Sequence, residues 1–175
     1  MQTSFEKNGV IYSFIDKTDR PEGGGYDRWS FNINGIEYFF DCDTQYISKK
    51  NEFVGIVEFY SNKNKTEDGP WELTNCANYH ATRVFRCIQE LLHHVWSWRK
   101  FSYISFSTEG KLFKICCQLT KKYKDVTDKI LKDIEVFFCL QLQTAIDAGY
   151  VQTRVIELKE ENRSGVEPKP VSDIT

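Results

Sequence analysis

An Asn-Gly pair at positions 34–35 constrains this chain more than any other feature of its sequence. It separates residues 28–33, in which apolar and polar side chains alternate, from residues 36–40, which are mainly aromatic. A type I′ turn needs positive φ at both central positions, and asparagine and glycine tolerate this best. The sequence therefore predicts a tight β-hairpin centred on residues 34–35.

Further strands and two helices are predicted around this hairpin. β-branched and aromatic residues favour strands, and Gly55 marks a bulge or a close approach. These strands are predicted at 10–15, 53–60 and 101–106. Apolar residues spaced three and four apart predict a long helix from about 77 to 98 and a second from 107 or 108 to about 124. The expected buried face of the second helix is Leu112, Cys116, Leu119 and Tyr123.

The last third of the chain leaves two interpretations open. Apolar residues in 128–148 have near-helical spacing, yet 134–142 would also suit a strand paired with 151–158. We prefer a helix that Gly149 ends, followed by a terminal strand. The expected architecture is one α+β domain over residues 1–159, with two or three helices packed on a mostly antiparallel, twisted sheet, and a disordered tail over 160–175.

Composition excludes several classes of protein. With 41% hydrophobic and 15% aromatic residues, the chain can bury enough apolar surface to fold, which excludes disordered and fibrous proteins. No apolar run approaches the ~20 residues that cross a bilayer, and we recognise no export signal, so we expect a cytoplasmic protein without membrane contact. The six cysteines include no Cys-x-x-Cys pair, which favours free, buried thiols.

Charge is unevenly distributed, although the net charge is only −2. Residues 82–124 hold nine basic and two acidic side chains, a local charge of +7. Such a segment suits phosphates or an acidic partner, but it also suits a solvated helix face, which we prefer. The residues that would contact nucleic acid are Arg83, Arg86, Lys111, Lys114, Lys121 and Lys122.

Few residues carry a pattern that indicates catalysis. Glu58 lies on the strand predicted at 53–60, either as a general base or as a solvent-facing residue, and we prefer the second interpretation. His80 lies about 10.5 Å along the predicted helix from Cys87, which is too far for direct proton transfer. Cys42 stands between two aspartates, whose charges disfavour the thiolate that a nucleophile needs.

A metal site is not expected. Glu90, His93 and His94 share one helix at a spacing that metal sites use. One helix supplies only two useful ligands, however, and Glu90 suits an ion pair with Arg86 one turn away.

Tryptophan and arginine gather near the ends of the long helix. These side chains most often dominate the binding energy of protein interfaces. Trp96 and Trp98 stand about 200° apart around a helix, so both cannot point into the same core, and either one of them is exposed or the helix ends there. The alternative to an interface role is that a tryptophan covers the open end of the protein's own core. The predicted interaction residues are Trp71, Trp96, Trp98, Arg99, Tyr103, Arg83 and Arg86.

Two segments resemble the GCN5-related N-acetyltransferases, and in particular small phage-encoded acetyltransferase-like proteins. They are residues 81–88, which lie in the predicted long helix, and 103–108 with 111–114, where a strand containing Phe-Ser leads into a basic helix. The likeness spans about residues 53–124 and includes the order hairpin, strand, long helix, strand, helix. It implies an acetyltransferase-like fold, and acetyl-CoA as the cofactor of an active member.

The chain departs from that family where the family performs its chemistry. The family places glycines before the long helix so that backbone N–H groups reach the coenzyme A pyrophosphate. Residues 75–81 contain no glycine, and Tyr79 and His80 would obstruct the pyrophosphate. Phe113 stands where the family often has a tyrosine acid, and it has no proton to donate. The positions that match the coenzyme loop are Ala77, Asn78, Tyr79, His80 and Ala81.

The leading hypothesis is therefore a non-catalytic protein without a cofactor that binds another macromolecule, such as a phage or mobile-element inhibitor of a host protein. An acyl-CoA-dependent N-acyltransferase with Glu58 as its base is the first alternative. A nucleic-acid-binding protein is the second, and self-association through the aromatic surface is a further one.

Overall fold

The computed structural model describes residues 3–62, 81–108, 110–131 and 152–158, and these form an α+β fold. The strands are β1 (Phe5–Lys7), β2 (Val10–Asp19), β3 (Gly25–Ile33), β4 (Ile36–Ile47), β5 (Glu52–Ser61), β6 (Tyr103–Thr108), β7 (Lys124–Asp125) and β8 (Gln152–Glu157). The helices are α1 (Ala81–Arg99), α2 (Gly110–Leu119) and α3 (Thr127–Leu131). A mostly antiparallel sheet with two or three helices was expected, and this coarse class is confirmed.

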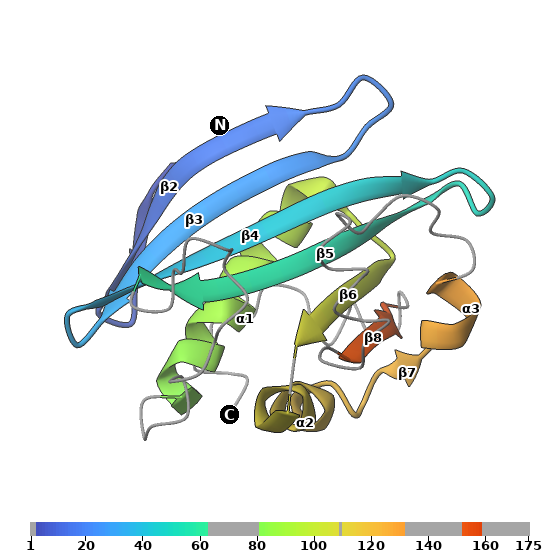
Figure 1. Ribbon diagram of the computed structural model, residues 1–175. Coiled ribbons are helices and arrows are strands. Elements are labelled where there is room, and N and C mark those ends of the chain that lie inside the picture. The colour runs from blue at the N-terminus through green and yellow to red at the C-terminus, as the bar shows by residue number, and fades with distance from the viewer. Residues whose placement is uncertain (1–2, 63–80, 109, 132–151, 159–175) are drawn as a thin grey trace.

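One curved sheet contains all the described strands, in the order β1-β2-β3-β4-β5-β6-β8-β7 (Figure 1). Neighbours pair antiparallel except β5 and β6, which are parallel and precede and follow α1 in the chain. Their pairing runs from Val54 opposite Tyr103 to Val57 opposite Phe106.

The predicted Asn-Gly hairpin is confirmed. Asn34 and Gly35 both have positive φ, at 51° and 79°, as a type I′ turn requires. The register of β3 with β4 is uninterrupted from Ile33 opposite Ile36 to Gly25 opposite Thr44. A two-residue turn thus aligns nine pairs of residues, and this alignment positions the candidate site described below.

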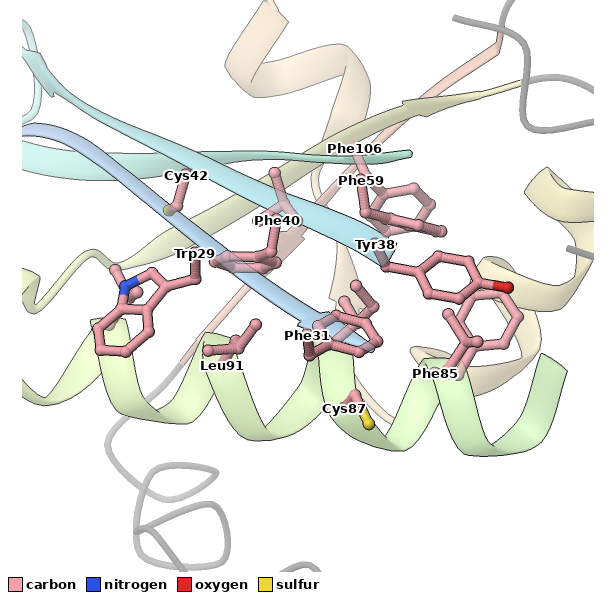
Figure 2. Packing of buried hydrophobic residues seen from close by; sticks show 14 of the residues in the cluster. Trp29, Phe31, Tyr38, Phe40, Cys42, Phe59, Phe85, Cys87, Leu91 and Phe106 are labelled. Atoms are coloured by element: carbon pink, nitrogen blue, oxygen red, sulfur yellow. The ribbon is translucent and has the colours of Figure 1, made fainter. Parts of the chain in front are cut away.

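The larger core lies between α1 and one face of the sheet (Figure 2). Trp29 of β3, Phe40 of β4 and Leu91 of α1 are completely buried in it. A smaller core on the opposite face packs Val126 and Ile130, at and beside α3, against β4, β5, β6 and β8. The sheet therefore has a helix-covered core on each face, but in different regions along its width.

Several elements differ in extent from their predictions. β4 continues to Ile47 and β2 to Asp19, well beyond the predicted ends. A second Asn-Gly turn at residues 8–9 adds the unpredicted β1. The second helix ends at Leu119 instead of about 124, because the chain turns at Thr120 and Lys124 then pairs with β8. Leu119 is consequently 41% exposed, not buried as predicted.

Gly55 marks a close approach and not a bulge. The registers of β5 with β4 and β6 pass through it without a shift. A Cβ atom at this position would lie 3.0 Å from the ring of Phe101. For the last third of the chain, α3 confirms that a helix begins near residue 128, and β8 confirms the terminal strand. Residues 132–148 lie outside the described parts of the chain.

Candidate functional site

A row of four charged side chains crosses the sheet. Asp16 of β2 lies opposite Arg28 of β3, Arg28 lies opposite Asp41 of β4, and Asp41 lies opposite Glu58 of β5. Residues that lie directly opposite one another share a face of the sheet, and their chain neighbours point to the other face. Because the neighbouring Trp29 enters the core beneath α1, the charged row occupies the face turned away from α1.

Arginine side chains hold two of the carboxylates on this face. Arg28 donates two hydrogen bonds to the buried Asp41, from Nε to Oδ1 and from Nη2 to Oδ2, both 2.8 Å long. This paired geometry is the strong form of an arginine–carboxylate contact, and it raises the pKa of Arg28. On the next row, Nη2 of Arg20 lies 2.7 Å from Oδ1 of Asp43. Asp41 and Asp43 therefore each have an arginine partner.

Glu58 has no such partner among the described residues. Burial, together with the charges of Asp41 and Asp43, raises its pKa from an ordinary 4.5 to about 7, although the charge of Arg28 opposes this rise. Desolvation and like charge both penalise the ionised carboxylate. At neutral pH Glu58 is therefore divided between its two protonation states, unlike an ordinary glutamate.

Aromatic side chains surround these carboxylates. Burial raises the pKa of Tyr26 and of Tyr60, and the charge of Asp41 adds to both effects. The guanidinium of Arg28 lies 5.5 Å from the ring centroid of Tyr26, and the rings of Tyr60 and Phe39 stack with centroids 5.3 Å apart. We call this set the Glu58 site: Tyr26, Arg28, Phe39, Asp41, Asp43, Glu58 and Tyr60. Its one unneutralised carboxyl can accept a proton or pair with a cation.

The predicted interaction residue Arg99 lies inside the fold. Its Nε donates to Oδ2 of the fully buried Asp27 over 2.7 Å, and Nη1 donates to Asp19 over 2.8 Å and to the carbonyl oxygen of Gly24 over 2.9 Å. The C-terminal end of α1 is thereby joined to β2, β3 and the turn between them. Arg99 supports the fold here, and its role at an interface stays a prediction.

The aromatic interaction residues also contact the rest of the fold. Trp96 and Trp98 are both partly buried and both pack against the larger core, so the prediction that they could not share one core is wrong. The Nε1–H of Trp96 donates to the carbonyl oxygen of Phe101, whereas Trp98 packs near Trp29. Tyr103 is buried and donates to Glu52 over 2.6 Å. Among the described residues, the predicted aromatic contacts are therefore made with the protein's own fold, and the role of these side chains at an interface stays a prediction.

The basic residues on the helices are accessible. Arg83 and Arg86 are exposed on α1, and Lys114, Lys121 and Lys122 are exposed on or just after α2. Because α1 covers the face opposite the Glu58 site, Arg83 and Arg86 lie on the other side of the sheet from Glu58. The nucleic-acid hypothesis stays a prediction, and phosphate contacts there would weaken steeply with added salt.

Several predicted positions cannot be placed. Trp71 and residues 77–80 of the proposed coenzyme loop lie outside the described residues, and Ala81 is the first residue of α1. Lys111 lies on α2, where its side chain is not described. Phe113 packs against Phe106 with ring centroids 6.2 Å apart.

The residues considered for metal binding do not converge. Glu90 accepts a hydrogen bond from Lys7 over 2.6 Å, so its partner is Lys7 and not Arg86 as predicted. The pairing of β1 with β2, which the sequence did not predict, brings Lys7 to α1. His94 lies between the rings of Phe5 and Trp98, with centroids 4.4 and 4.9 Å away, and burial lowers its pKa. In the parts of the chain that the structure describes, no three potential ligands are grouped around a common point.

The four cysteines in the described residues are free, as predicted, and three of them are buried, whereas Cys76 and Cys139 lie outside the described residues. Cys42, Cys87 and Cys116 are free and buried, and Cys117 is free and partly buried. Burial raises the pKa of Cys42 and brings that of Cys116 to about 12, so their thiols resist ionisation.

Sequence reasoning found Glu58 but missed the residues around it. The hairpin register offered a signal, because residues equidistant from the turn at 34–35 must pair. That rule alone places Arg28 opposite Asp41 and Tyr26 opposite Asp43. The position of Glu58 beside Asp41 depends on the longer connection between β4 and β5, for which the sequence shows no equivalent signal.

Comparisons with known proteins find no matching family model, no matching curated protein and no matching solved structure. No helix among the described residues has both the length and the apolar character needed to cross a bilayer.

Proposed function

We propose that this chain binds another macromolecule without catalysing a reaction, and that the Glu58 site receives a basic side chain of that partner. The observation that supports this is the unequal pairing of three carboxylates on one sheet face. Asp41 and Asp43 have arginine partners, whereas Glu58 has none among the described residues and is half-buried. A lysine or arginine from a partner would complete the set.

The electrostatics of the site favour such a partner. Glu58 is disfavoured as an anion because it is desolvated beside two other carboxylates. An incoming cation reverses that balance, since an opposite charge within about 4–6 Å stabilises the ionised form. Binding would therefore lower the pKa of Glu58 and would strengthen as the pH rises through about 7.

Aromatic side chains beside Glu58 offer the apolar contact that such an interface needs. Tyr26 and Phe39 are partly exposed on either side of the Arg28–Asp41 pair. Tyrosine, tryptophan and arginine are enriched in the central parts of interfaces, where they combine buried area with a polar end. The site thus combines a cation-binding carboxyl with contact surface on one rigid sheet.

The scaffold in this proposal is acetyltransferase-like. The support is the order of elements: an antiparallel hairpin, β5, α1, a parallel β6 and then α2. The absence of glycine from residues 75–81 and the phenylalanine at position 113 argue against the family's reaction. In the setting that the resemblance suggests, the partner would be a host protein.

An acyl-CoA-dependent N-acyltransferase is the second candidate, favoured by the pKa of Glu58. A carboxyl with a pKa of about 7 is well suited to act as a general base at neutral pH. In that case the cation at Glu58 would be a substrate ammonium group, from which Glu58 removes a proton before acyl transfer.

Selection from a displayed library of random peptides tests the first proposal. Wild-type protein should enrich peptides that contain lysine or arginine, and the Glu58→Gln variant should lose that enrichment. Glu37→Gln is a matched control on the same sheet face but at the hairpin end, and it should select as the wild type does. Equal enrichment by all three proteins, or none, would refute the assignment of Glu58.

Coenzyme A binding separates the two candidates. The proposal of a non-catalytic protein expects no saturable heat on titration with acetyl-CoA and no acetylation of an amine panel. Micromolar binding together with acetyl transfer that Glu58→Gln abolishes would replace it with the second candidate.

A further inference from the structure

A cavity of about 120 Å³ lies between α1 and α2, above the face of the sheet formed by β5, β6 and β8. Apolar side chains line most of the cavity. The polar lining residues, Gln89, His93, Thr120 and Lys122, lie on α1 or just after α2. The lining residues include Phe59, Ile88, Leu92, Phe106, Cys116 and Ile156. Well-packed interiors contain few voids larger than a water molecule, so a space of this size is unusual in a core.

Size and lining indicate an apolar occupant. An engineered apolar cavity of about 150 Å³ stays dry and takes up benzene. The present cavity is slightly smaller, so it suits an apolar group of about six carbons. Leu119 lines the cavity and is also 41% exposed, which places an opening to solvent at the C-terminal end of α2.

A positive charge stands at this opening. Lys122 lines the cavity and is exposed, and its Nζ lies 5.2 Å from the ring centroid of Tyr123, another lining residue. Lys122 forms no ion pair with a described carboxylate. An apolar interior with a cation at its mouth is complementary to an amphiphile that has an anionic head.

We propose that this cavity binds the chain of a medium-length alkanoate, with the carboxylate at Lys122. The site is independent of the proposed function, because Val57 and Phe59 face the cavity while Glu58, between them, points to the opposite face of the sheet. Loss of either site leaves the other intact, so the two proposals succeed or fail separately.

Calorimetric titration with a series from butanoate to decanoate tests the apolar part. Each methylene that enters the cavity should raise affinity about fourfold, and the gain should stop near six carbons, when the cavity is full. The indole N–H resonance of Trp96, which lines the cavity, should shift on binding, whereas that of Trp29, buried between β3 and α1, should not. No saturable binding at any chain length would overturn the proposal.

Charge is tested with a pair of neighbouring lysines. Hexanoate should bind about two- to fivefold more tightly than hexan-1-ol, which is the usual range for one exposed ion pair. Lys122→Gln should remove that preference, and Lys121→Gln should retain it, because Lys121 is exposed but does not line the cavity. Both lysines are at the surface, so folding is preserved. A preference that survives in Lys122→Gln, or equal binding of hexylammonium, would refute the assignment of the head group.

Discussion

Replacing Glu58 with glutamine should stabilise the folded protein at high pH and leave it nearly unchanged at low pH. Glutamine has almost the shape of a protonated glutamate, but it stays neutral at every pH. The variant therefore removes the cost of ionising a carboxyl that is desolvated and lies opposite Asp41. That cost is a property of the folded chain, since the unfolded chain exposes the group to water.

The magnitude follows from the pKa. One pKa unit corresponds to about 1.4 kcal/mol between the two protonation states. With a pKa of about 7 in the folded protein and an ordinary 4.5 in the unfolded chain, the full difference is about 3 kcal/mol. This is a large fraction of the 5–15 kcal/mol that typically stabilises a domain.

The direction with pH is fixed by which state binds the proton more tightly. Below pH 4.5 Glu58 is protonated in both states, so it costs nothing. Between pH 4.5 and 7 the unfolded chain releases the proton while the folded protein keeps it, and stability falls as the pH rises. The difference in unfolding free energy between Glu58→Gln and wild type should therefore rise from near zero to about 3 kcal/mol by pH 8.

Urea unfolding at several pH values between 4.5 and 8 measures this difference directly. The other titrating groups cancel between variant and wild type, and Glu37→Gln, at the hairpin end of the same sheet face, supplies the baseline for an amide substitution. A difference that stays flat across this range, or that favours wild type at pH 8, would show that Glu58 is not held as an unpaired buried acid.

Two further substitutions test how the site is supported. Arg99→Ala should destabilise the fold by about 3–5 kcal/mol, because it leaves the fully buried Asp27 without its cation, whereas the exposed Arg86→Ala should change stability by less than about 0.5 kcal/mol in the same urea assay. Gly55→Ala should cost about 1–3 kcal/mol, since its Cβ would press on the buried Phe101 ring, and an unchanged melting temperature would contradict that contact.

The Asn34–Gly35 turn is enough to predict much of the candidate site. Once Asn34 and Gly35 form the turn, the pairing of β3 with β4 is determined for its whole length. Arg28 then must lie opposite Asp41, and both must share a face with Tyr26. Local turn chemistry and the period of two along a strand are sufficient for this part of the site.

The third strand of the site could not be derived in the same way. β4 and β5 are joined by residues 48–51, a connection too long for one dominant turn geometry. A shift of the register by two residues would keep every apolar side chain on its proper face, and it would move Glu58 away from Asp41. The alternation of β5 identifies the face of Glu58 correctly, but not its neighbours.

The predicted aromatic interface shows a different limit. Trp98 and Arg99 have the chemistry of interface residues, and the same chemistry serves a protein's own interior equally well. The deciding contact for Arg99 is Asp27, which is 72 residues distant in sequence and fully buried. No local sequence pattern predicts a contact between residues so far apart in the chain.

The pairing of carboxylates with arginines across the sheet determines which carboxyl group remains available to bind an external cation. Arg99 forms an ion pair with Asp27 on the face beneath α1, and Arg28 forms one with Asp41 on the opposite face. Each arginine comes from an element that the fold brings alongside, so the pairs exist only after the sheet forms. Glu58 is a half-buried acid for which the described fold provides no arginine partner, and the cost of its ionisation is what an external cation would relieve. The same raised pKa therefore predicts both the gain in stability from Glu58→Gln and the loss of basic ligands in that variant.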